Sequence, residues 1–453
     1  MKRAFFLTLL SLLFQYTAMA ASYKIGIAKT KITPETPFWM TGYAARTVPS
    51  TGVLHDLWAK AIIIEERPGH RIVIITTDLL GLPRQISEKA ANLLQAKFNI
   101  TRSQIMFNSS HTHSGPMVWP NLGILADYTY EDQKKISAYG DFLVDKFVAV
   151  VTEAIGNMTD MQLSVGHTEV LFGMNRRRIV PTGVAHTENK VGVNDHDVPV
   201  LKITTPDGKV KGILFGYACH NTTIQADNTL INGDYAGFAQ IALEAKYPDA
   251  VAMFVIGCAG DQNPAPRGTI ELAKQHGENL AAEVSKLVDG KMRAINPTVQ
   301  STYSTIDLEF NPYPIDKYQK DMTSGDQYLQ RRAKLMLDAY NRGWDITRYN
   351  YPIQAINFGN SFYIIALGGE PTVDYSLKLK QLLKNKDVFV AGYSNEVVCY
   401  IPSERVLAEG GYEAESNLIY YGMAGPFKPG LENKIITKAV ADIKKISGSG
   451  SKK

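Results

Sequence analysis

The chain has 453 residues, of which 45% are hydrophobic and 20% are charged, and its formal net charge at pH 7 is +4. This length allows a large buried core, and a small, dispersed charge without a basic stripe excludes nucleic acid as the expected partner. Three cysteines are too few for a disulfide scaffold and form no C-x-x-C pair, so we expect Cys219, Cys258 and Cys399 to be small buried residues.

The first twenty residues predict a secretory signal peptide. Lys2 and Arg3 precede a short apolar run at 4–14, and the sequence AMA at 18–20 is a small-x-small cleavage site. No later stretch reaches roughly 18 uninterrupted apolar residues, so we expect no transmembrane segment. The predicted location is therefore the periplasm or the outside of the cell.

Short apolar strands alternate with amphipathic helices along the rest of the chain. The predicted strands span residues 71–77, 104–108, 210–218, 251–256 and 388–392. The predicted helices span residues 85–96, 139–155, 235–246, 272–287 and 372–383. This alternation indicates an α/β fold with a mixed, mostly parallel sheet flanked by helices. Polar and apolar residues alternate at 301–310, which predicts an added antiparallel or edge strand.

No linker separates two self-sufficient halves, so residues 21–446 are predicted to form a single large catalytic domain after the signal peptide at 1–20. Residues 311–350 are rich in Tyr, Asp, Lys and Arg and have a helical middle at 327–340. They predict an insert or lid over the core. The last residues, 447–453, read SGSGSKK and are expected to be a flexible tail.

Polar segments follow several predicted strands, at the place where open α/β sheets bind ligands. In NSSHTHSGP at 108–116, His111 and His113 point the same way if the chain is extended, and neutral imidazole is the commonest metal ligand. His220 ends another strand in ACHNTT. Taken singly, an H-x-H pair is a weak signal, and a lone histidine at a strand end is more often a hydrogen-bonded structural residue.

Two further segments carry a carboxylate and tyrosines. Glu370 lies in GGEPT after an apolar run, and Tyr400 and Tyr412 lie in the segment at 392–413. Alone, Glu370 also fits a carboxylate at a helix N-terminus, and the tyrosines also fit amphipathic core positions. The remaining candidates, which fit either a pocket or a structural hydrogen bond, are His55, Asp56 and Asp78. The histidines without such context, expected at the surface or in turns, are His70, His167, His186 and His276.

Together these segments resemble the neutral (non-lysosomal) ceramidase family, over roughly residues 25–418. The resemblance is carried by SHTHSGP, by the His-ended strand followed by NGDYAGFA, by GGEPT, and by GYSN, CYIPSE and GYEAE, where Tyr412 comes twelve positions after Tyr400. It implies one zinc ion bound by His111, His220, Glu370 and Tyr400. It also implies that His113 and Tyr412 face the reacting group and that Asn175-Arg176 belongs to a substrate segment.

The chemistry of this residue set is coherent in itself. Two histidines and a carboxylate are a common catalytic zinc set, and zinc lowers the pKa of bound water to about 7, which makes it a nucleophile. His113 is then predicted to move a proton, and Tyr412 and Arg176 to stabilise the oxyanion. The predicted substrate contacts are Asn175, Asp261, Gln262 and His55.

The sequence departs from the family at Asn263, in GDQNP at 260–264, where ceramidases carry a serine needed for activity. Asparagine can hold a substrate by hydrogen bonds but is no nucleophile. A zinc-water mechanism needs no nucleophile there, so we expect hydrolysis to survive and ceramide to be a poor substrate. The chain ends 41 residues after Tyr412, so we expect the catalytic domain without the immunoglobulin-like C-terminal domain of typical ceramidases.

Three functions stay open on the sequence. The first is a zinc-dependent hydrolase that cleaves an amide or ester of an acylated small molecule, a lipid or a sugar. The second is a degenerate relative that binds metal and ligand without turnover. Asn263 favours this hypothesis, whereas the complete set of four metal ligands disfavours it. The third is a glycan-active enzyme of the same fold, which the polar insert and the Asn/Gln pair at 262–263 favour.

Overall fold

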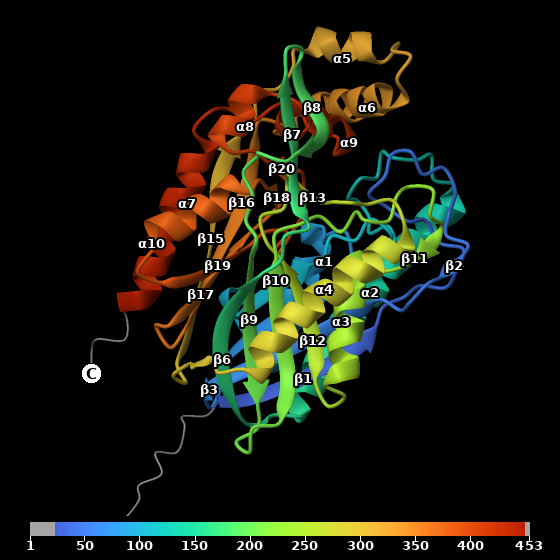
Figure 1. The fold of residues 1–453 in the computed structure, drawn as a ribbon. Helices are drawn as coiled ribbons and strands as arrows, with labels where there is room; N and C mark the ends of the chain where they lie inside the picture. The colour runs from blue at the N-terminus through green and yellow to red at the C-terminus, as the bar shows by residue number, and fades with distance from the viewer. Residues whose placement is uncertain (1–22, 449–453) are drawn as a thin grey trace, which may run out of the picture.

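The computed structural model describes residues 23–448, so the predicted signal peptide at 1–20 lies outside the described residues. Two β-sheets packed face to face form its centre (Figure 1). The larger sheet has the order β12-β10-β9-β6-β1-β3-β4-β5, with β14 paired to β6, and the smaller has the order β15-β16-β17-β19. The strands of the larger sheet are β1 (Tyr23–Lys31), β3 (Trp58–Arg67), β4 (His70–Thr77), β5 (Ile105–Ser109), β6 (Thr159–Glu169), β9 (Asp197–Thr204), β10 (Val210–Tyr217), β12 (Val251–Ile256) and β14 (Arg293–Ala294). Those of the smaller sheet are β15 (Val299–Glu309), β16 (Arg348–Phe358), β17 (Phe362–Leu367) and β19 (Asp387–Ala391).

Helices cover the outer face of each sheet. They are α1 (Arg84–Phe98), α2 (Tyr130–Gly156), α3 (Asp234–Lys246), α4 (Ile270–Asp289), α7 (Asp374–Leu382) and α10 (Leu431–Gly448). α1 and α2 pack on β1, β3, β4 and β5, whereas α3 and α4 pack on β9, β10 and β12. α7 and α10 cover the smaller sheet. The layers therefore run helices, sheet, sheet, helices (Figure 1).

The alternation of side chains along β3 explains this layering. Ala59, Ala61 and Ile63 pack with the helical layer, whereas Ile62 and Ile64 pack with the smaller sheet. A strand covered on both faces is apolar at nearly every position, and burying one such isoleucine stabilises the fold by about 1.5–3 kcal/mol. The core between the sheets therefore joins them into one unit.

The predicted α/β fold with a mixed sheet flanked by helices is confirmed, and β15 is an antiparallel edge strand as expected. In contrast to the expected parallel majority, two of the eight strand pairs described in the larger sheet are parallel, β4–β5 and β10–β12. Helices α1 and α3 make the connections within those two pairs. Short hairpins such as the turn at 68–69 join other neighbours, and a short hairpin forces an antiparallel pair.

Two element ends differ from the prediction. α2 begins nine residues before the predicted start at 139, because the side chain of Thr129 accepts a hydrogen bond from the backbone of Asp132 and the Asp132 carboxylate accepts one in return. α10 includes the first two residues of the predicted tail, where the Ser447 hydroxyl donates to the Ile443 carbonyl at 2.7 Å. The rest of the predicted tail, 449–453, lies outside the described residues.

The larger sheet curls until its two edges meet. β5 and β12 stand at opposite ends of the strand order, yet the Ile256 backbone N–H donates to Asn108 Oδ1 at 3.1 Å. Accumulated strand twist produces such curling. Its consequence is that the loops following β5, β10 and β12 come together on one side of the molecule.

Smaller elements surround that side. They are β2 (Gly52–Val53), β7 (Gly173–Val180), β8 (Gly183–Asn189), β11 (Leu230–Ile231), β13 (Gln262–Pro264), β18 (Glu370–Pro371), β20 (Tyr400–Ile401), α8 (Glu404–Glu409), a π-helical turn (Tyr412–Ser416) and α9 (Asn417–Tyr420). The segment at 311–347 carries α5 (Ile315–Asp321) and α6 (Gln327–Asn341), which confirms the predicted helix at 327–340. Figure 1 shows α5, α6 and the β7–β8 hairpin at the top of the molecule.

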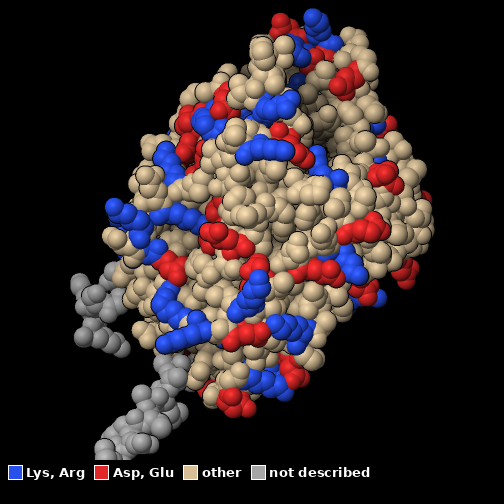
Figure 2. Space-filling view, in the orientation of Figure 1, with Lys and Arg blue, Asp and Glu red and all other residues tan. Residues whose placement is uncertain are grey.

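The surface carries both signs of charge. Lys and Arg are interspersed with Asp and Glu on the face shown in Figure 2. Between residues 23 and 448, no helix is both long enough and apolar enough to cross a membrane. Cys219, Cys258 and Cys399 are buried, as expected.

Candidate active site and metal centre

The loops that follow β5, β10 and β17 each deliver one side chain to a common point. His111 lies two residues beyond β5, His220 three residues beyond β10, and Glu370 three residues beyond β17. His111 has a left-handed backbone (φ 65°), which is uncommon for a residue with a side chain and often marks a functional site. The candidate site is therefore built on the ends of strands from both sheets, as open α/β sheets build theirs.

Four ligand-type atoms converge there. Glu370 Oε2 lies 3.2 Å from His111 Nε2 and 3.2 Å from His220 Nε2, and the Tyr400 hydroxyl lies 3.1 Å from His220 Nε2. All four side chains are buried. Ligands on a tetrahedral ion with bonds of about 2.0–2.1 Å stand roughly 3.3 Å apart, so this spacing fits one small metal cation.

The other nitrogen of each ligand-type histidine is tied to the backbone. His111 Nδ1 donates to the Leu80 carbonyl at 2.7 Å, and His220 Nδ1 donates to the Ala259 carbonyl at 2.6 Å. These bonds leave the Nε2 lone pairs facing the Glu370 carboxylate. Lone pairs that face a carboxylate at 3.2 Å are mutually repulsive unless a cation lies between them, and such outer hydrogen bonds are typical of metal-ligating histidines.

Glu370 and Tyr400 are held by backbone pairing. They are direct partners in the parallel bridge between β18 and β20. The Glu370 carboxylate also accepts hydrogen bonds from Tyr421, and from Tyr393 at 3.4 Å. The carboxylate is therefore fixed from several directions.

Burial dominates the electrostatics of the cluster, and it favours the neutral, ligand form of His220. Burial, together with the nearby Arg176 charge, lowers the pKa of His220 to about 3, so this imidazole is neutral at pH 7. Burial raises the pKa of Tyr400 well above 10, while the positive charge of Arg176 opposes that rise.

His113 belongs to the cluster but differs from the other two histidines. Its Nε2 lies 3.1 Å from His111 Nε2, and ring nitrogens of His111, His113 and His220 lie within 4.8 Å of one another. Its Nδ1 is buried without a hydrogen-bond partner beneath the backbone of Gly42, where an added Cβ would lie 2.6 Å from that nitrogen. His113 thus lacks the backbone tie that orients a ligand, which suits a group that moves a proton.

Arg176 on β7 lies behind Tyr400 and not in the cavity. Its Nη2 donates to the Tyr400 hydroxyl at 3.0 Å, its Nη1 to Asn263 Oδ1 at 3.0 Å, and its Nε to Glu413 at 2.8 Å. Asn263 also accepts a hydrogen bond from Thr222 at 3.2 Å. These contacts fit a positioning role for Arg176 and Asn263, and neither side chain lines the cavity beside the cluster.

A cavity of about 210 Å³ opens beside the cluster. His111, His113, Glu370, Tyr400 and Tyr412 form its polar end. Its remaining lining is Gly42, Tyr43, Ala44, Leu80, Leu122, Leu125, His186, Tyr420 and Tyr421. Within residues 23–448 the Tyr412 hydroxyl has no protein hydrogen-bond partner, so it is available to a ligand.

The predicted substrate contacts do not line this cavity. Asn175 donates to Asp261 at 3.1 Å, and Gln262 donates to the Val193 carbonyl at 3.0 Å. Asp261 also accepts a hydrogen bond from the Val373 backbone at 2.8 Å. His55 packs against Phe238 and accepts weakly from Gly233. Asn175, Asp261 and Gln262 therefore stabilise the loop after β12. Closeness in sequence to Arg176 or Asn263 does not bring a residue into the cavity lining.

Several residues in or beside the cavity could not be predicted from the sequence. His186, expected at the surface or in a turn, lines the mouth and packs on Tyr412 with ring centroids 5.2 Å apart. Tyr420 and Tyr421 line the wall, and Tyr393 bonds the Glu370 carboxylate. Tyr393 lies inside the GYSN motif, so that signal was present, whereas nothing local marks His186 because only the tertiary fold brings its hairpin to the site.

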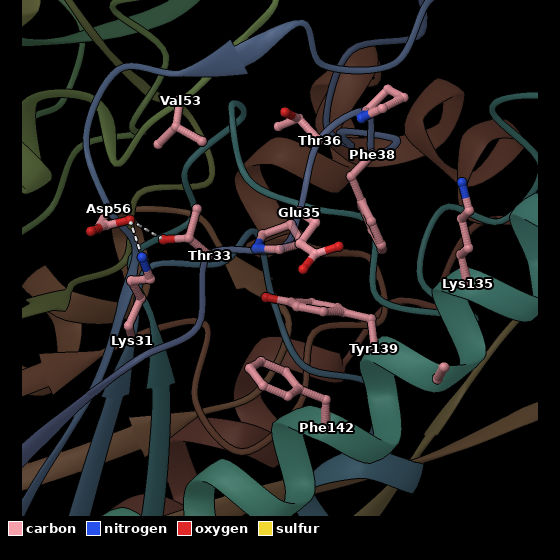
Figure 3. Close-up of a pocket in the computed structure, with 13 residues that line it drawn as sticks. Lys31, Thr33, Glu35, Thr36, Phe38, Val53, Asp56, Lys135, Tyr139 and Phe142 are labelled. Carbon is pink, nitrogen blue, oxygen red and sulfur yellow. Dashed lines mark hydrogen bonds and ion pairs between the residues drawn. The ribbon is translucent and has the colours of Figure 1, made fainter.

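A larger groove of about 990 Å³ lies elsewhere, between the loop after β1 and helix α2 (Figure 3). Its Asp56 carboxylate is already bonded to Thr33 at 2.9 Å and paired with Lys31 at 3.4 Å, as the dashed lines in Figure 3 mark. Tyr139 donates to the Ile32 carbonyl. Because no histidine lines this groove and the ligand-type cluster lies at the smaller cavity, the smaller cavity is the candidate active site.

Comparison with known proteins identifies the family to which this chain belongs. The model of the family "Neutral/alkaline non-lysosomal ceramidase, N-terminal" matches residues 23–306. Neutral ceramidase of Pseudomonas aeruginosa is 29% identical over 259 residues, which are 53% of this chain and 37% of that protein. Neutral ceramidase of Mycobacterium tuberculosis is 22% identical over an alignment 461 residues long, which covers 84% of this chain and 71% of that protein. The chain thus matches little more than a third of the length of the first of these relatives.

The fold comparison extends further along the chain. The crystal structure of neutral ceramidase from Pseudomonas aeruginosa superposes with a TM-score of 0.73 at 19% identity, covering 94% of this chain and 75% of that one. A structure titled "Ceramidase complexed with C2" gives a TM-score of 0.72 at 18% identity. These likenesses concern the fold, and the matched family model concerns the sequence. The chain belongs to the neutral/alkaline non-lysosomal ceramidase family.

Proposed function

We propose that this protein is an exported, zinc-dependent hydrolase that cleaves an amide or ester bond of an acylated lipid or sugar. The observation that carries the proposal is the convergence of His111, His220, Glu370 and Tyr400, whose facing atoms lie 3.1–3.2 Å apart beside a cavity. Nitrogen and oxygen ligands at this spacing suit zinc. When bound, zinc would supply a Lewis acid and lower the pKa of a coordinated water molecule.

His113 is the residue we assign to proton transfer. Burial, with His111 and His220 nearby, lowers its pKa well below 6.5, so it is neutral at pH 7 and able to accept a proton. Its Nδ1 has no protein partner, and the imidazole faces the cavity. A neutral base at the polar end of the cavity can take the proton of the attacking water and return it to the leaving group.

Tyr412 is the residue we assign to the oxyanion. Burial raises its pKa, so its hydroxyl stays protonated and can donate a hydrogen bond to the developing charge. Arg176 acts through Tyr400 instead. A guanidinium 3.0 Å from the phenol oxygen stabilises the phenolate, which is the form that binds a metal.

The test combines metal content with a substrate panel. Protein purified without chelators should contain about one zinc per chain and should hydrolyse aryl esters or acyl amides, with activity lost on chelation and restored by zinc. Long-chain ceramide should be a poor substrate, because a cavity of about 210 Å³ is small for a long fatty chain. Absence of zinc, with no uptake on addition, would refute the metal assignment, and stoichiometric zinc without turnover on any member would favour the degenerate ligand-binding relative.

Export and domain boundaries form a separate proposal. We propose cleavage after residue 20 and one catalytic domain over 21–446, on the strength of the signal-peptide pattern and the shared core between the two sheets. N-terminal sequencing of the protein from the periplasm or medium should begin at Ala21. Recovery of a chain that starts at Met1 would contradict the proposed processing.

A further inference from the structure

The insert at 311–347 reaches the wall of the catalytic cavity. Its helix α6 contacts α9, and its buried Tyr318, Ala333 and Met336 form a small core together with Ala424, which follows α9. In Figure 1 this unit stands at the top of the molecule, on the side where the site lies. The insert is therefore placed to shape the cavity without contributing to the metal cluster.

Two side chains of α6 tie it to two separate loops. The Tyr328 hydroxyl donates to the Ala44 carbonyl at 2.7 Å, and its ring packs edge-on against Tyr420 with centroids 5.2 Å apart. Arg331 donates to the Ile124 carbonyl at 2.9 Å and pairs with Asp127 at 2.5 Å. α6 thus bridges the loop that follows β1 and the loop that precedes α2.

Those two loops carry the apolar end of the cavity. Leu80, Leu122 and Leu125 form one buried cluster, and Ala44 and Tyr328 pack against it. Leu122 lines the cavity from a left-handed backbone (φ 53°), a conformation that is uncommon for a residue with a side chain and persists only where its surroundings impose it. The contacts of Arg331 with the same loop are such a restraint.

The cavity beside the cluster is small. At about 210 Å³ the cavity lies below the roughly 300–1,000 Å³ typical of pockets for drug-sized ligands. At ~30 Å³ for each water-sized group it holds about seven such groups, including those at the reacting centre. A long fatty chain does not fit in that volume, whereas a short acyl group does.

We propose that the insert closes the acyl end of the cavity and restricts this enzyme to short acyl groups, of about two to six carbons. The inference rests on the proposed function and narrows its substrate class. The polar end holds the metal ligands, His113 and Tyr412, and the leucine end receives the short acyl chain. Tyr328 and Arg331 are specificity-determining residues that hold this end closed and do not touch the reacting atoms.

A series of p-nitrophenyl esters, from acetate and butyrate through hexanoate to dodecanoate, tests the proposal with zinc-loaded protein. We expect kcat/KM to fall at least tenfold between hexanoate and dodecanoate. Tyr328→Ala and Arg331→Ala should raise the ratio of dodecanoate to butyrate activity at least tenfold. The matched control is Tyr340→Ala, on the same helix but 59% exposed, which should leave the ratio unchanged.

A binding measurement separates this inference from the proposed function. Butyrate should raise the melting temperature of the zinc-loaded protein at concentrations where dodecanoate does not, and Tyr328→Ala should abolish that selectivity. If no ester is hydrolysed but the protein still binds butyrate in preference to dodecanoate, the hydrolase proposal fails. The inference that the insert limits the length of the acyl group is then retained. Equal use or equal binding of both chain lengths by the unaltered protein, or an unchanged ratio in both α6 variants, would overturn the inference.

Discussion

Two histidine–carboxylate clusters in this protein have opposite electrostatics. In the metal cluster, three histidines surround one carboxylate, that of Glu370. In the second cluster, which we call the strut, one histidine lies between two carboxylates: His167 is 2.7 Å from Asp197 and 2.7 Å from Asp387. The strut joins β6 and β9 of the larger sheet to β19 of the smaller one.

Burial and the neighbouring charges decide the protonation of each cluster. Burial, with Arg176 nearby, lowers the pKa of His220 to about 3. Burial acts in the same direction on His167, but hydrogen bonds and charge from its two carboxylates outweigh it and raise the pKa to about 9. Neutral imidazoles present lone pairs to a metal cation, whereas an imidazolium completes an ion network and needs no metal.

Removing a ligand histidine is the strongest way to break this comparison. His220→Ala should reduce the zinc content from about one per chain to near zero and reduce hydrolysis to background, because it removes one of four ligands. Elemental analysis and the ester assay measure both effects. His167→Gln should leave the zinc content unchanged.

His55→Ala is a second control for that experiment. The sequence placed His55 in the site, but the structure places it against Phe238 and away from the cluster. It should therefore retain zinc. Retention of full zinc by His220→Ala would show that the cluster does not hold the metal.

The two tyrosines of the site sharpen the comparison between holding a metal and acting on a substrate. Tyr412→Phe should leave zinc bound and reduce kcat roughly 100- to 1,000-fold, the usual loss for one oxyanion donor. Tyr400→Phe should instead weaken zinc retention in a chelator competition, by at least about tenfold. Equal zinc affinity and equal kcat in both variants would make them packing residues, and His113 would then be the first candidate for the fourth ligand.

The periodic pattern of apolar residues predicted many of the strands and helices. The motifs predicted the residues that come together in the metal cluster. His111, His220 and Glu370 follow apolar strands, where a ligand at a sheet edge is expected. Strand direction was not readable, because a hairpin and a helical crossover leave the same apolar run. The residues that line the cavity could not be predicted either, because His186 reaches the site from the β7–β8 hairpin, which is distant in sequence from the other lining residues.

Asn175, Asp261 and Gln262, which the sequence predicts as substrate contacts, lie outside the cavity lining for a shared physical reason. Motif residues beside a metal site can build the loop that positions the ligands, and a sequence does not distinguish that role from substrate contact. The carboxylate of Asp261 accepts from the Val373 backbone and the Asn175 amide, which fixes the chain next to Glu370. His167 shows the reverse, since a histidine without local context holds the two sheets together.

A smaller effect is expected at Asn263. Asn263→Ser removes an oxygen that accepts from Arg176 at 3.0 Å and from Thr222 at 3.2 Å. Loss of these contacts should loosen Arg176 and thereby Tyr400, with a change of about tenfold in kcat/KM that falls equally on short and long esters. A selective gain on long-chain substrates would instead show that this position sets specificity directly.

The strut gives the smallest effect, and its sign follows from its pKa. The folded pKa of His167, about 9, lies above the ordinary value of 6.5, so its contribution to stability is complete below pH 6.5 and is lost as the pH rises through 9. The charged groups around it are Asp195, Asp197, Asp387, Lys380 and Arg293. Because the imidazole is 33% exposed, solvent screens these pairs and the contribution should be about 1 kcal/mol.

His167→Gln should therefore destabilise the protein at pH 6 and have little effect near pH 10, where the unaltered imidazole is itself neutral. Thermal unfolding of both proteins at fixed zinc concentration, between pH 6 and 10, measures the difference. His70→Gln is the matched control. His70 and its one carboxylate neighbour, Glu66 at 3.2 Å, both belong to the β3–β4 hairpin, whereas His167 lies between two sheets. A difference between His167→Gln and the unaltered protein that is constant across this range would mean that His167 contributes by packing, and the contrast with the metal cluster would then lie in geometry and not in charge.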